Sequence, residues 1–304
     1  MISMVLPTKN RAHTLRLVAT SYFSQECVSE IIFVNDAGVD DTRNILENIS
    51  KDFPDVTLKI HDNPKCVGAS EARNIGASLA SNDYILFCDD DEYMEQGYAK
   101  TCLNKLKKLD AGAVSGRRVY MRDNESCDEA LERFGHGMRR SKPMNYIICE
   151  LVNGAIYTSD QSLPFTNAII LTRKDLLEKF PFDSFYARGN GYREETDYQM
   201  NLFVNGYDIY VTNDCHTMHL PLSQVKTGGQ RVKRFKRIYW SIYYTRYFFN
   251  KYYDRYAKRV GVKVPKQIAL FLFSCFAIYK ELLRPTLYNI AMSALKFKRS
   301  ITKG

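Results

Sequence analysis

Four acidic residues stand together at the end of an apolar stretch of this chain. Residues 84–88 have the length and composition of a buried strand, and Asp89, Asp90, Asp91 and Glu92 follow at once. Adjacent carboxylates repel one another unless a cation or hydrogen-bond donors gather beside them. A hard divalent ion, Mg²⁺ or Mn²⁺, prefers such oxygen ligands. The alternative interpretation is a solvated acidic loop after an ordinary strand.

Two earlier apolar stretches also end in polar residues. Residues 2–6 and 30–34 read as buried strands, and the polar segments 7–11 and 35–38 follow them. Strands alternate with helices at about 25–30 residues per unit, which is typical of an α/β fold with a doubly wound, mostly parallel sheet flanked by helices. Ligands bind such sheets at the carboxyl ends of the strands. The three polar clusters are therefore expected at one sheet edge.

A nucleotide is the ligand that these side chains favour. Thr8 and Asp36 could hydrogen-bond a base, Arg73 could reach the base or a phosphate, and Asp89 with Asp91 could hold a metal on a diphosphate. Each residue also has an ordinary interpretation, as a turn residue, a strand-end cap or a surface helix residue. Their convergence at one edge favours a binding pocket.

The order of these motifs resembles the family 2 glycosyltransferases of the GT-A fold. The motifs are Leu6-Pro7-Thr8-x-Asn10-Arg11, Val34-Asn35-Asp36-Ala37-Gly38 with Asp41-Thr42, Gly68-x-x-x-Ala72-Arg73-Asn74-Ile75-Gly76, and Leu86-Phe87-Cys88-Asp89-Asp90-Asp91. The resemblance implies a nucleoside-diphosphate-sugar donor, with a UDP-sugar as the first choice, and a D-x-D motif that holds Mn²⁺ or Mg²⁺. The implied nucleotide-binding residues are Pro7, Thr8, Asn10, Asp36, Arg73, Asp89 and Asp90. One departure is Asn35, where the family has an acid.

Further along the chain, acidic residues open an expected helix. Residues 165–171 read as a strand, 173–180 as a helix and 193–205 as a helix that Gly206 ends. Acids in a first helical turn are stabilised by the helix dipole, which by itself explains them. The family carries a Glu-Asp pair here whose second acid is the general base, so the resemblance implies that Glu195 is the catalytic base, with Asp197 and Glu194 as alternates. The base would deprotonate an acceptor hydroxyl that displaces the diphosphate, inverting the anomeric carbon.

Two histidines follow an expected strand over residues 208–212. Cys215, His216 and His219 could begin a zinc site, but no second ligand pair has suitable spacing. The family resemblance implies a histidine that completes the metal site, and His219 fits that position better than His216. The expected metal ligands are Asp91, Asp89 and His219. The alternative is a histidine with no ligand role.

The charge of the chain is unevenly distributed. Residues 226–304 hold 19 Lys and Arg against two acids, whereas residues 1–225 hold 24 against 32. Eleven aromatic residues lie between Arg231 and Tyr256, interleaved with basic ones, and residues 268–279 are mostly apolar. This pattern favours helices at an anionic membrane surface. Helices packed on the catalytic domain are the alternative, and nucleic acid is disfavoured because the acidic body would repel it.

The sequence predicts three regions: residues 1–115 for the nucleotide-sugar half of a GT-A domain, 116–222 for the acceptor half, and 223–304 for a helical membrane-associating extension. Eight irregularly spaced cysteines, an N-terminus without signal-peptide features and no long apolar run predict a cytoplasmic protein, peripheral on the inner face of the membrane.

The predicted function is an inverting, metal-dependent glycosyltransferase acting on a hydroxyl or phosphate of a glycan or lipid-linked acceptor. A non-catalytic nucleotide-sugar-binding or membrane-adaptor protein is the alternative, and a metal-dependent nucleotidyltransferase is a third. The donor sugar and base, the acceptor and the oligomeric state are not determined by the sequence.

Overall fold

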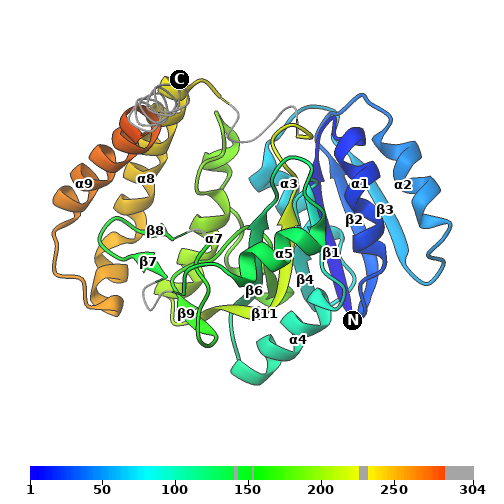
Figure 1. Cartoon of the computed structure of the whole chain (residues 1–304), viewed down its shortest axis with the longest axis horizontal. Coiled ribbons are helices and arrows are strands. Elements are labelled where there is room, and N and C mark those ends of the chain that lie inside the picture. The colour runs from blue at the N-terminus through cyan, green and yellow to red at the C-terminus, as the bar shows by residue number, and fades with distance from the viewer. Residues whose placement is uncertain (140–142, 153, 226–231, 285–304) are drawn as a thin grey trace, which may run out of the picture.

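The computed structural model describes residues 1–139, 143–152, 154–225 and 232–284, and within them a mixed sheet of nine strands runs through the middle of the molecule (Figure 1). Its strands are β1 (Ile2–Thr8), β2 (Val28–Asn35), β3 (Thr57–Asp62), β4 (Tyr84–Phe87), β5 (Glu92–Met94), β6 (Ala113–Tyr120), β9 (Gln161–Leu163), β10 (Leu171–Arg173) and β11 (Ile209–His219). The spatial order is β3-β2-β1-β4-β10-β6-β11-β5, and β9 pairs with β11.

The first four strands of that order are parallel, and helices cover both of their faces. The helices are α1 (Ala12–Phe23), α2 (Thr42–Ser50) and α3 (Ala69–Leu79). Burial on both faces explains why β1, β2 and β4 are mostly apolar, whereas the edge strand β3 is only partly buried and carries polar residues. Gly76 brings α3 close to the sheet, because a Cβ there would lie 2.3 Å from Val5 Cγ1. The predicted alternation of strands and helices is confirmed in this half.

The second half of the sheet mixes directions. The short strand β10 runs antiparallel to β4 and β6, whereas β11 is parallel to β6 and antiparallel to β5. α6 (Lys174–Lys179) and α7 (Glu194–Val204) confirm the two predicted helices. The remaining elements of this half are α4 (Tyr98–Leu109), α5 (Cys127–Gly135), the hairpin of β7 (Met144–Asn145) with β8 (Glu150–Leu151), and a 3₁₀ turn, η1 (Ser184–Ala187).

Two strand predictions in this half were wrong in extent. Residues 165–170 form an irregular buried segment, and the strand starts only at Leu171. Side chains there replace the sheet ladder, since Thr166 N–H donates to Gln199 Oε1 at 2.7 Å and Ile169 N–H donates to Asn167 Oδ1 at 2.9 Å. β11 is longer than the expected 208–212, and a register shift lets it continue to His219. The apolar composition of residues 165–170 thus correctly indicated that they are buried, but not that they form a strand. The end of β11 was predicted seven residues too early.

Two long helices lie side by side at the end of the molecule away from β3 (Figure 1). They are α8 (Arg234–Val260) and α9 (Lys266–Ile278), and a π-helical turn, η2 (Tyr279–Leu283), continues α9. α8 packs on α7 with a buried face made mostly of aromatic rings, namely Tyr244, Phe248, Phe249, Tyr252, Tyr253 and Tyr256. These rings are protein core, so the prediction that the aromatic stretch lies among lipid headgroups was wrong for this face. None of the described helices is long and apolar enough to cross a bilayer.

Candidate active site

The ends of β1 and β2 form the first wall of the site. Asp36 N–H donates to Thr8 O at 2.8 Å, which confirms that the two polar clusters meet. The Asp36 carboxylate accepts hydrogen bonds from Asn63 Nδ2, Cys66 Sγ, Val67 N–H and Gly68 N–H, at 2.7–3.0 Å. Burial alone would raise the pKa of Asp36, but these bonds outweigh it and lower the pKa. Asp36 thus fixes the loop before α3, and its contact with a base stays a prediction.

Two asparagines shape the turn beside Asp36. Asn35 Oδ1 accepts from Gly38 N–H at 2.9 Å, and its amide donates to Asp62 at 2.8 Å. Asn10 Oδ1 accepts from Val39 N–H at 2.8 Å. An amide at position 35 therefore both donates and accepts within the turn, which a carboxylate could not do. Asn10 thus helps to hold the turn in shape, and nucleotide contacts for Pro7 and Asn10 stay predictions.

The acid run after β4, residues 89–92, has arginine partners on one side and a histidine on the other. Asp89 lies 2.9 Å from Arg73 Nη2 and 2.8 Å from Arg118 Nη2. Asp90 lies 3.5 Å from Arg11 Nε, and Asp91 lies 3.8 Å from His219 Nε2. Arginines therefore neutralise part of the crowded charge that the sequence suggested a metal would offset. Arg11 and Arg118 were not assigned a role from the sequence.

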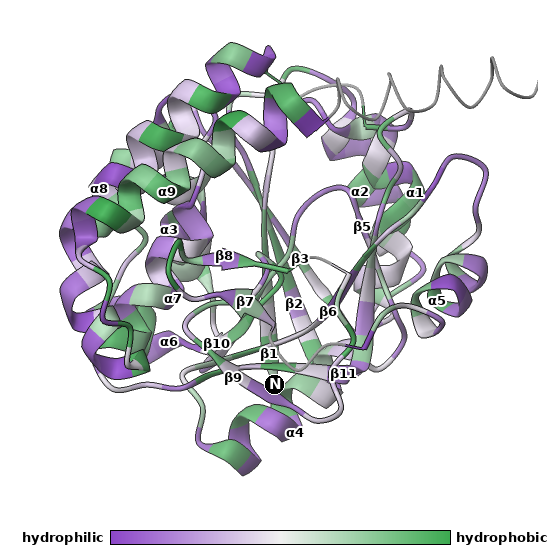
Figure 2. Cartoon of the chain, turned by 60° about the vertical axis from the view of Figure 1, so that its left-hand side comes forward, coloured by the Kyte–Doolittle hydropathy of each residue, from purple (hydrophilic) through white to green (hydrophobic). Residues whose placement is uncertain are grey.

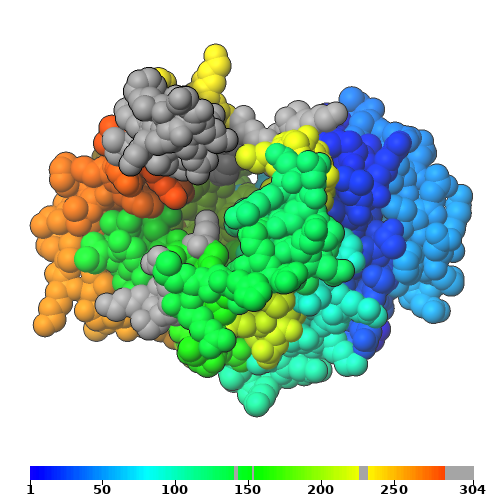
Figure 3. Space-filling model, viewed as in Figure 1, coloured from blue at the N-terminus to red at the C-terminus, as the bar shows by residue number. Residues whose placement is uncertain are grey.

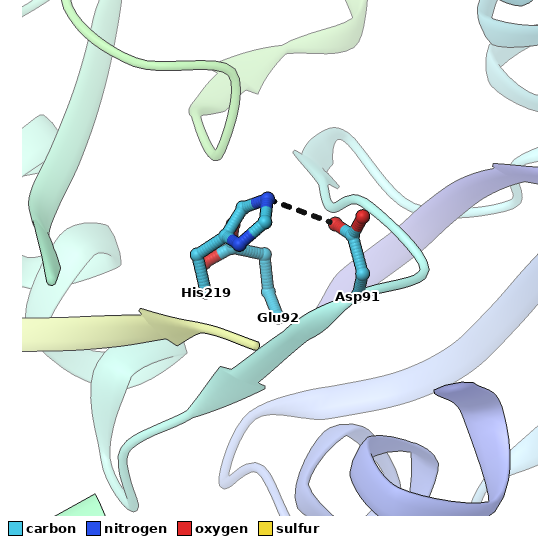
Figure 4. A group of neighbouring side chains, drawn as sticks. All are labelled: Asp91, Glu92 and His219. Atoms are coloured by element: carbon cyan, nitrogen blue, oxygen red, sulfur yellow. Dashed lines mark ion pairs between the residues drawn. The ribbon is translucent and has the colours of Figure 1, made fainter. Parts of the chain in front are cut away.

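A candidate metal site remains at Asp91, Glu92 and His219. One ligand atom from each of the three lies within 4.8 Å of the others. Figure 4 shows the three side chains close together. Antiparallel pairing of β5 with β11 sets Glu92 directly opposite His219, which explains how residues so far apart meet. The structure does not bring Asp89, a predicted ligand, into this group, because two arginines hold its carboxylate. Glu92 takes that place and had been assigned no ligand role.

The three side chains fit a hard divalent cation. Glu92 is fully buried, burial raises its pKa to about 8 in spite of Arg118, and its Oε2 has no hydrogen-bond partner among the described residues. His219 Nδ1–H donates to the carbonyl of Leu220 at 2.6 Å, which leaves Nε2 directed at Asp91. Burial and nearby Arg118 lower the pKa of His219, favouring the neutral ring that binds metals.

A chain of alternating acidic and basic side chains, which are buried or partly buried, connects this group to α7. Glu92 pairs with Arg118, Arg118 with Asp89, Asp89 with Arg73, and Arg73 with Glu194 at the first position of α7. Ser70 Oγ also donates to Glu194, at 3.1 Å. Each acidic side chain in this chain faces an arginine, which offsets the cost of its low exposure to water. The acid run and the acids of α7 therefore belong to one site.

The three acids of α7 differ in their surroundings. Glu194 forms an ion pair with Arg73. Asp197 is 1% exposed, and its carboxylate accepts hydrogen bonds from the hydroxyls of Tyr186 and Tyr252 at 2.9 Å each. It also forms an ion pair with Lys251. Within the described part of the chain, the Glu195 carboxylate makes no hydrogen bond or ion pair to another side chain. Burial and the neighbouring Glu194 raise its pKa to about 7. Of the three candidates, Glu195 alone has a carboxylate with no partner of this kind.

Comparison with known proteins decides the family. The model named Glycosyl transferase family 2 matches residues 3–174, more than half of the chain. The chain belongs to this family. Both the resemblance seen in its motifs and the GT-A fold are confirmed.

Relatives of this family 2 chain include a β-1,3-glucosyltransferase of Campylobacter jejuni whose name gives GalNAc(5)-diNAcBac-PP-undecaprenol as its substrate. It is 30% identical over 105 residues, 34% of each protein. The chain spans about a third or less of the first two curated relatives that it matches. A structure of TarS of Staphylococcus aureus in complex with UDP has a similar fold, with a TM-score of 0.57 and 15% identity, and the match covers 90% of this chain and 70% of TarS. The mannosyltransferase PcManGT of Pyrobaculum calidifontis, in complex with GDP-Man and Mn²⁺, is also similar, with a TM-score of 0.58 and 14% identity. That match covers 97% of this chain and 79% of PcManGT.

Outside the family match, α8 holds the end of α7 that carries Glu195. Lys251 lies 2.9 Å from Asp197 and 2.7 Å from Asp183, and Arg193 donates to Thr245 at 2.8 Å. The sequence analysis missed this contact. Lys251 and Thr245 lie among the aromatic positions of α8 that turn out to be buried. Because polar groups on a buried face need partners, these two residues could have indicated that α8 packs against acidic or basic side chains.

Trp240, the tryptophan of α8, covers the turn before α7. Gly189 has φ +67°, and a Cβ there would lie 2.5 Å from the Trp240 ring, so only glycine suits both the backbone and the contact. The aromatic helix that was predicted to meet a membrane therefore packs behind the start of α7, the helix that carries Glu195.

Proposed function

We propose that this chain transfers a sugar from a nucleoside-diphosphate sugar to a glycan or lipid-linked acceptor, with inversion at the anomeric carbon. The observation that carries the proposal is the chain of alternating acidic and basic side chains from Glu92 to Glu194. It joins a group suited to a divalent cation with a helix whose next residue, Glu195, has a carboxylate suited to proton transfer. A transferase needs both within one site.

The donor side is assigned to the sheet edge. Asp91, Glu92 and His219 would hold Mn²⁺ or Mg²⁺, and such an ion supplies positive charge to a leaving diphosphate. Arg73 and Arg118 add fixed positive charge on the same side, each already oriented by Asp89. Thr8 and Asp36 border the place where the base is expected.

Glu195 is assigned the general base. A carboxyl whose pKa is about 7 is about half ionised at pH 7, and its ionised form is a stronger base than that of an exposed glutamate. It takes the proton of the acceptor hydroxyl while that oxygen attacks the anomeric carbon from the side opposite the diphosphate. One displacement of this kind inverts the configuration. Glu194 orients the helix through Arg73, and Asp197 does so through Lys251.

The donor we propose is a UDP-sugar, supported by the TarS complexes with UDP and UDP-GlcNAc. The acceptor we propose is a hydroxyl or phosphate of a glycan or lipid-linked glycan, at the inner face of the cell membrane. Its support is the undecaprenol-linked substrate named for the Campylobacter relative and the basic C-terminal region.

Two measurements test the proposal. A thermal-shift panel of UDP, GDP, dTDP and CMP, each with and without Mn²⁺, should give stabilisation by one nucleotide that requires the metal. Release of the nucleoside diphosphate during turnover, lost in Glu195→Gln, separates a transferase from a non-catalytic binding protein. Release of pyrophosphate instead would indicate a nucleotidyltransferase, and no binding by any nucleotide would overturn the proposal.

A further inference from the structure

One side of α9 carries a continuous stripe of exposed apolar side chains. Ile268, Phe271 and Leu272 are 51%, 66% and 41% exposed, and Ile278 and Tyr279 continue the stripe at 42% and 46%. They lie three, four, ten and eleven positions after Ile268, which places all five on one helical face. Cys275, also exposed, lies between them on that face. The helix forms an outer edge of the molecule (Figure 3).

The opposite side of α9 already has its partner. Ala269, Phe273 and Ala277 are buried, and α9 packs along α8. Colouring by hydropathy shows apolar residues over much of α9, on the outside of α8 (Figure 2). A helix that is apolar on all sides normally lies inside a protein or in contact with lipid. The stripe therefore takes no part in packing α9 against the rest of the described protein, and its apolar side chains face outward.

The surroundings of the stripe are strongly basic. Residues 232–284 contain 13 Lys and Arg against two acids. Both acids already face a cation, since Asp254 lies 3.6 Å from Lys266 and Glu281 lies 2.9 Å from Arg237. Lys263, Lys280 and Arg284 are exposed beside the two ends of the stripe. This side of the molecule therefore presents apolar groups framed by positive charge.

A groove between α8 and α9 opens beside the stripe. It measures about 460 Å³ and is lined by Arg246, Asn250, Lys266 and Gln267, with Phe271 at its apolar side. Two cations and two amides next to an exposed phenylalanine suit a phosphate group attached to an acyl chain. The groove and the stripe have the polarity of a headgroup and the hydrocarbon below it.

We propose that the outer face of α9 is a docking surface for an anionic lipid bilayer, on which the helix lies in the plane of the membrane. Phe271 and its apolar neighbours enter the boundary below the headgroups, and Arg246 with Lys266 contact lipid phosphate. A second copy of the chain fits this face poorly, because two-fold contact would set the basic frames against each other. Only the biological role of this surface rests on the proposed function: membrane binding would bring the active site to a lipid-linked acceptor.

Vesicle co-sedimentation of the full chain tests the surface without any sugar substrate. Wild type should bind vesicles of phosphatidylglycerol and phosphatidylcholine, bind pure phosphatidylcholine less, and lose affinity as salt rises. Phe271→Asp should weaken binding roughly tenfold or more, since an exposed aromatic ring that would enter the bilayer is replaced by a charge. The matched control is Leu17→Asp on α1, where the leucine is 54% exposed, and it should bind like wild type.

The groove has its own variant. Arg246→Gln combined with Lys266→Gln should reduce the preference for phosphatidylglycerol while keeping weak binding to neutral vesicles. Glycerol phosphate at millimolar concentration should not compete, because the apolar stripe must enter the bilayer as well. Competition by it would overturn the lipid assignment.

Three results would overturn the proposal: no binding of wild type to anionic vesicles, equal binding by Phe271→Asp, or a wild-type dimer that this substitution dissociates. Leu272→Gln, a milder change, replaces Phe271→Asp if the latter does not fold. Nucleotide thermal shifts on the same variants should equal those of wild type. Loss of vesicle binding with intact nucleotide binding thus separates failure of this surface from failure of the proposed transferase.

Discussion

Arg73 and Glu194 form a buried ion pair although 121 positions separate them in the chain. Arg73 comes from α3, in the N-terminal half of the sheet, and Glu194 is the first residue of α7. The same guanidinium group also binds Asp89, so one side chain fixes the distance between the acid run and α7. Such a pair acts mainly through position, because the cost of burying the two charges offsets most of their attraction.

Substitution of Arg73 should therefore be costly. Arg73→Met leaves the buried Glu194 without its cation, and we expect the free energy of unfolding to fall by roughly 3–5 kcal/mol, measured by urea denaturation. Arg16→Met is the control: its pair with Asp41 is at 3.2 Å, but the two side chains are 61% and 51% exposed. That variant should change stability by less than about 1 kcal/mol. Equal effects would contradict the structural role given to Arg73.

Removing the proposed base should abolish transfer while leaving the donor site intact. Glu195→Gln keeps the shape of the side chain, and we expect turnover to fall by roughly 10²–10⁴-fold, with the nucleotide thermal shift unchanged. Asp197→Asn should instead lower stability, because it removes the charge that pairs with Lys251. A variant at position 195 that retains full turnover would remove Glu195 from the mechanism.

The raised pKa of Glu195 gives a pH dependence with a definite sign. The base acts when ionised, so kcat/KM should rise with pH around a midpoint near 7. For stability the sign is opposite. Between about pH 4.5 and 7 the Glu195 carboxyl is protonated in the folded state, because its pKa there is about 7, but ionised in the unfolded state, where its pKa is 4.5. The free energy of unfolding therefore falls as pH rises through this range. Glu195→Gln should consequently raise Tm at pH 8 and leave it unchanged at pH 4. A lower Tm at pH 8 would contradict this.

The two histidines of β11 offer a matched test of the metal site. His219→Ala should eliminate the Mn²⁺-dependent part of the stabilisation by UDP, because it removes one of three candidate ligands. His216→Ala should keep it, since His216 lies outside that group and its Nδ1 is 2.9 Å from Glu95. Thermal shift and direct Mn²⁺ titration both report the difference. Identical behaviour of the two variants would count against the metal assignment.

The contact between α8 and α7 should couple a distant helix to catalysis. Lys251→Met leaves Asp197 buried with only its two tyrosine partners, so we expect a stability loss of roughly 2–4 kcal/mol and a fall in kcat larger than any change in KM for the donor. Lys258→Met, at an exposed position of the same helix, is the control. The contrary outcome is a normal kcat in a destabilised Lys251→Met.

The sheet edge was predictable because its signals are local. Buried strands such as β1 and β4 are short apolar runs, and the polar residues after them are adjacent in sequence, so Thr8, Asp36 and the acid run could be placed from the sequence. Family membership added Glu195 and His219, which no spacing rule would have selected alone. The irregular segment 165–170 was assigned wrongly because apolar composition reports burial whatever the backbone conformation.

The residues that were missed act across long sequence distances. Glu92 enters the candidate metal group only because β5 pairs with β11, and Arg118 meets Asp89 only because of the order of strands in the sheet. Two of the partners of Asp197, Lys251 and Tyr252, lie 54 and 55 positions later, on a helix whose aromatic and basic composition indicated a surface role. Neither register nor helix docking can be read from one sequence, because both depend on the assembled core.

The pairing of Asp197 with Lys251 and Tyr252 also sets an order in time. During synthesis, the strands of the donor side and the acid run leave the ribosome first, and α7 follows them. Its buried aspartate has no lysine partner until α8 has emerged and docked, and an unpaired buried charge opposes stable folding. The nucleotide-binding half can therefore form early, whereas the end of α7 that carries Glu195 becomes fixed only when nearly all of the described chain has been made.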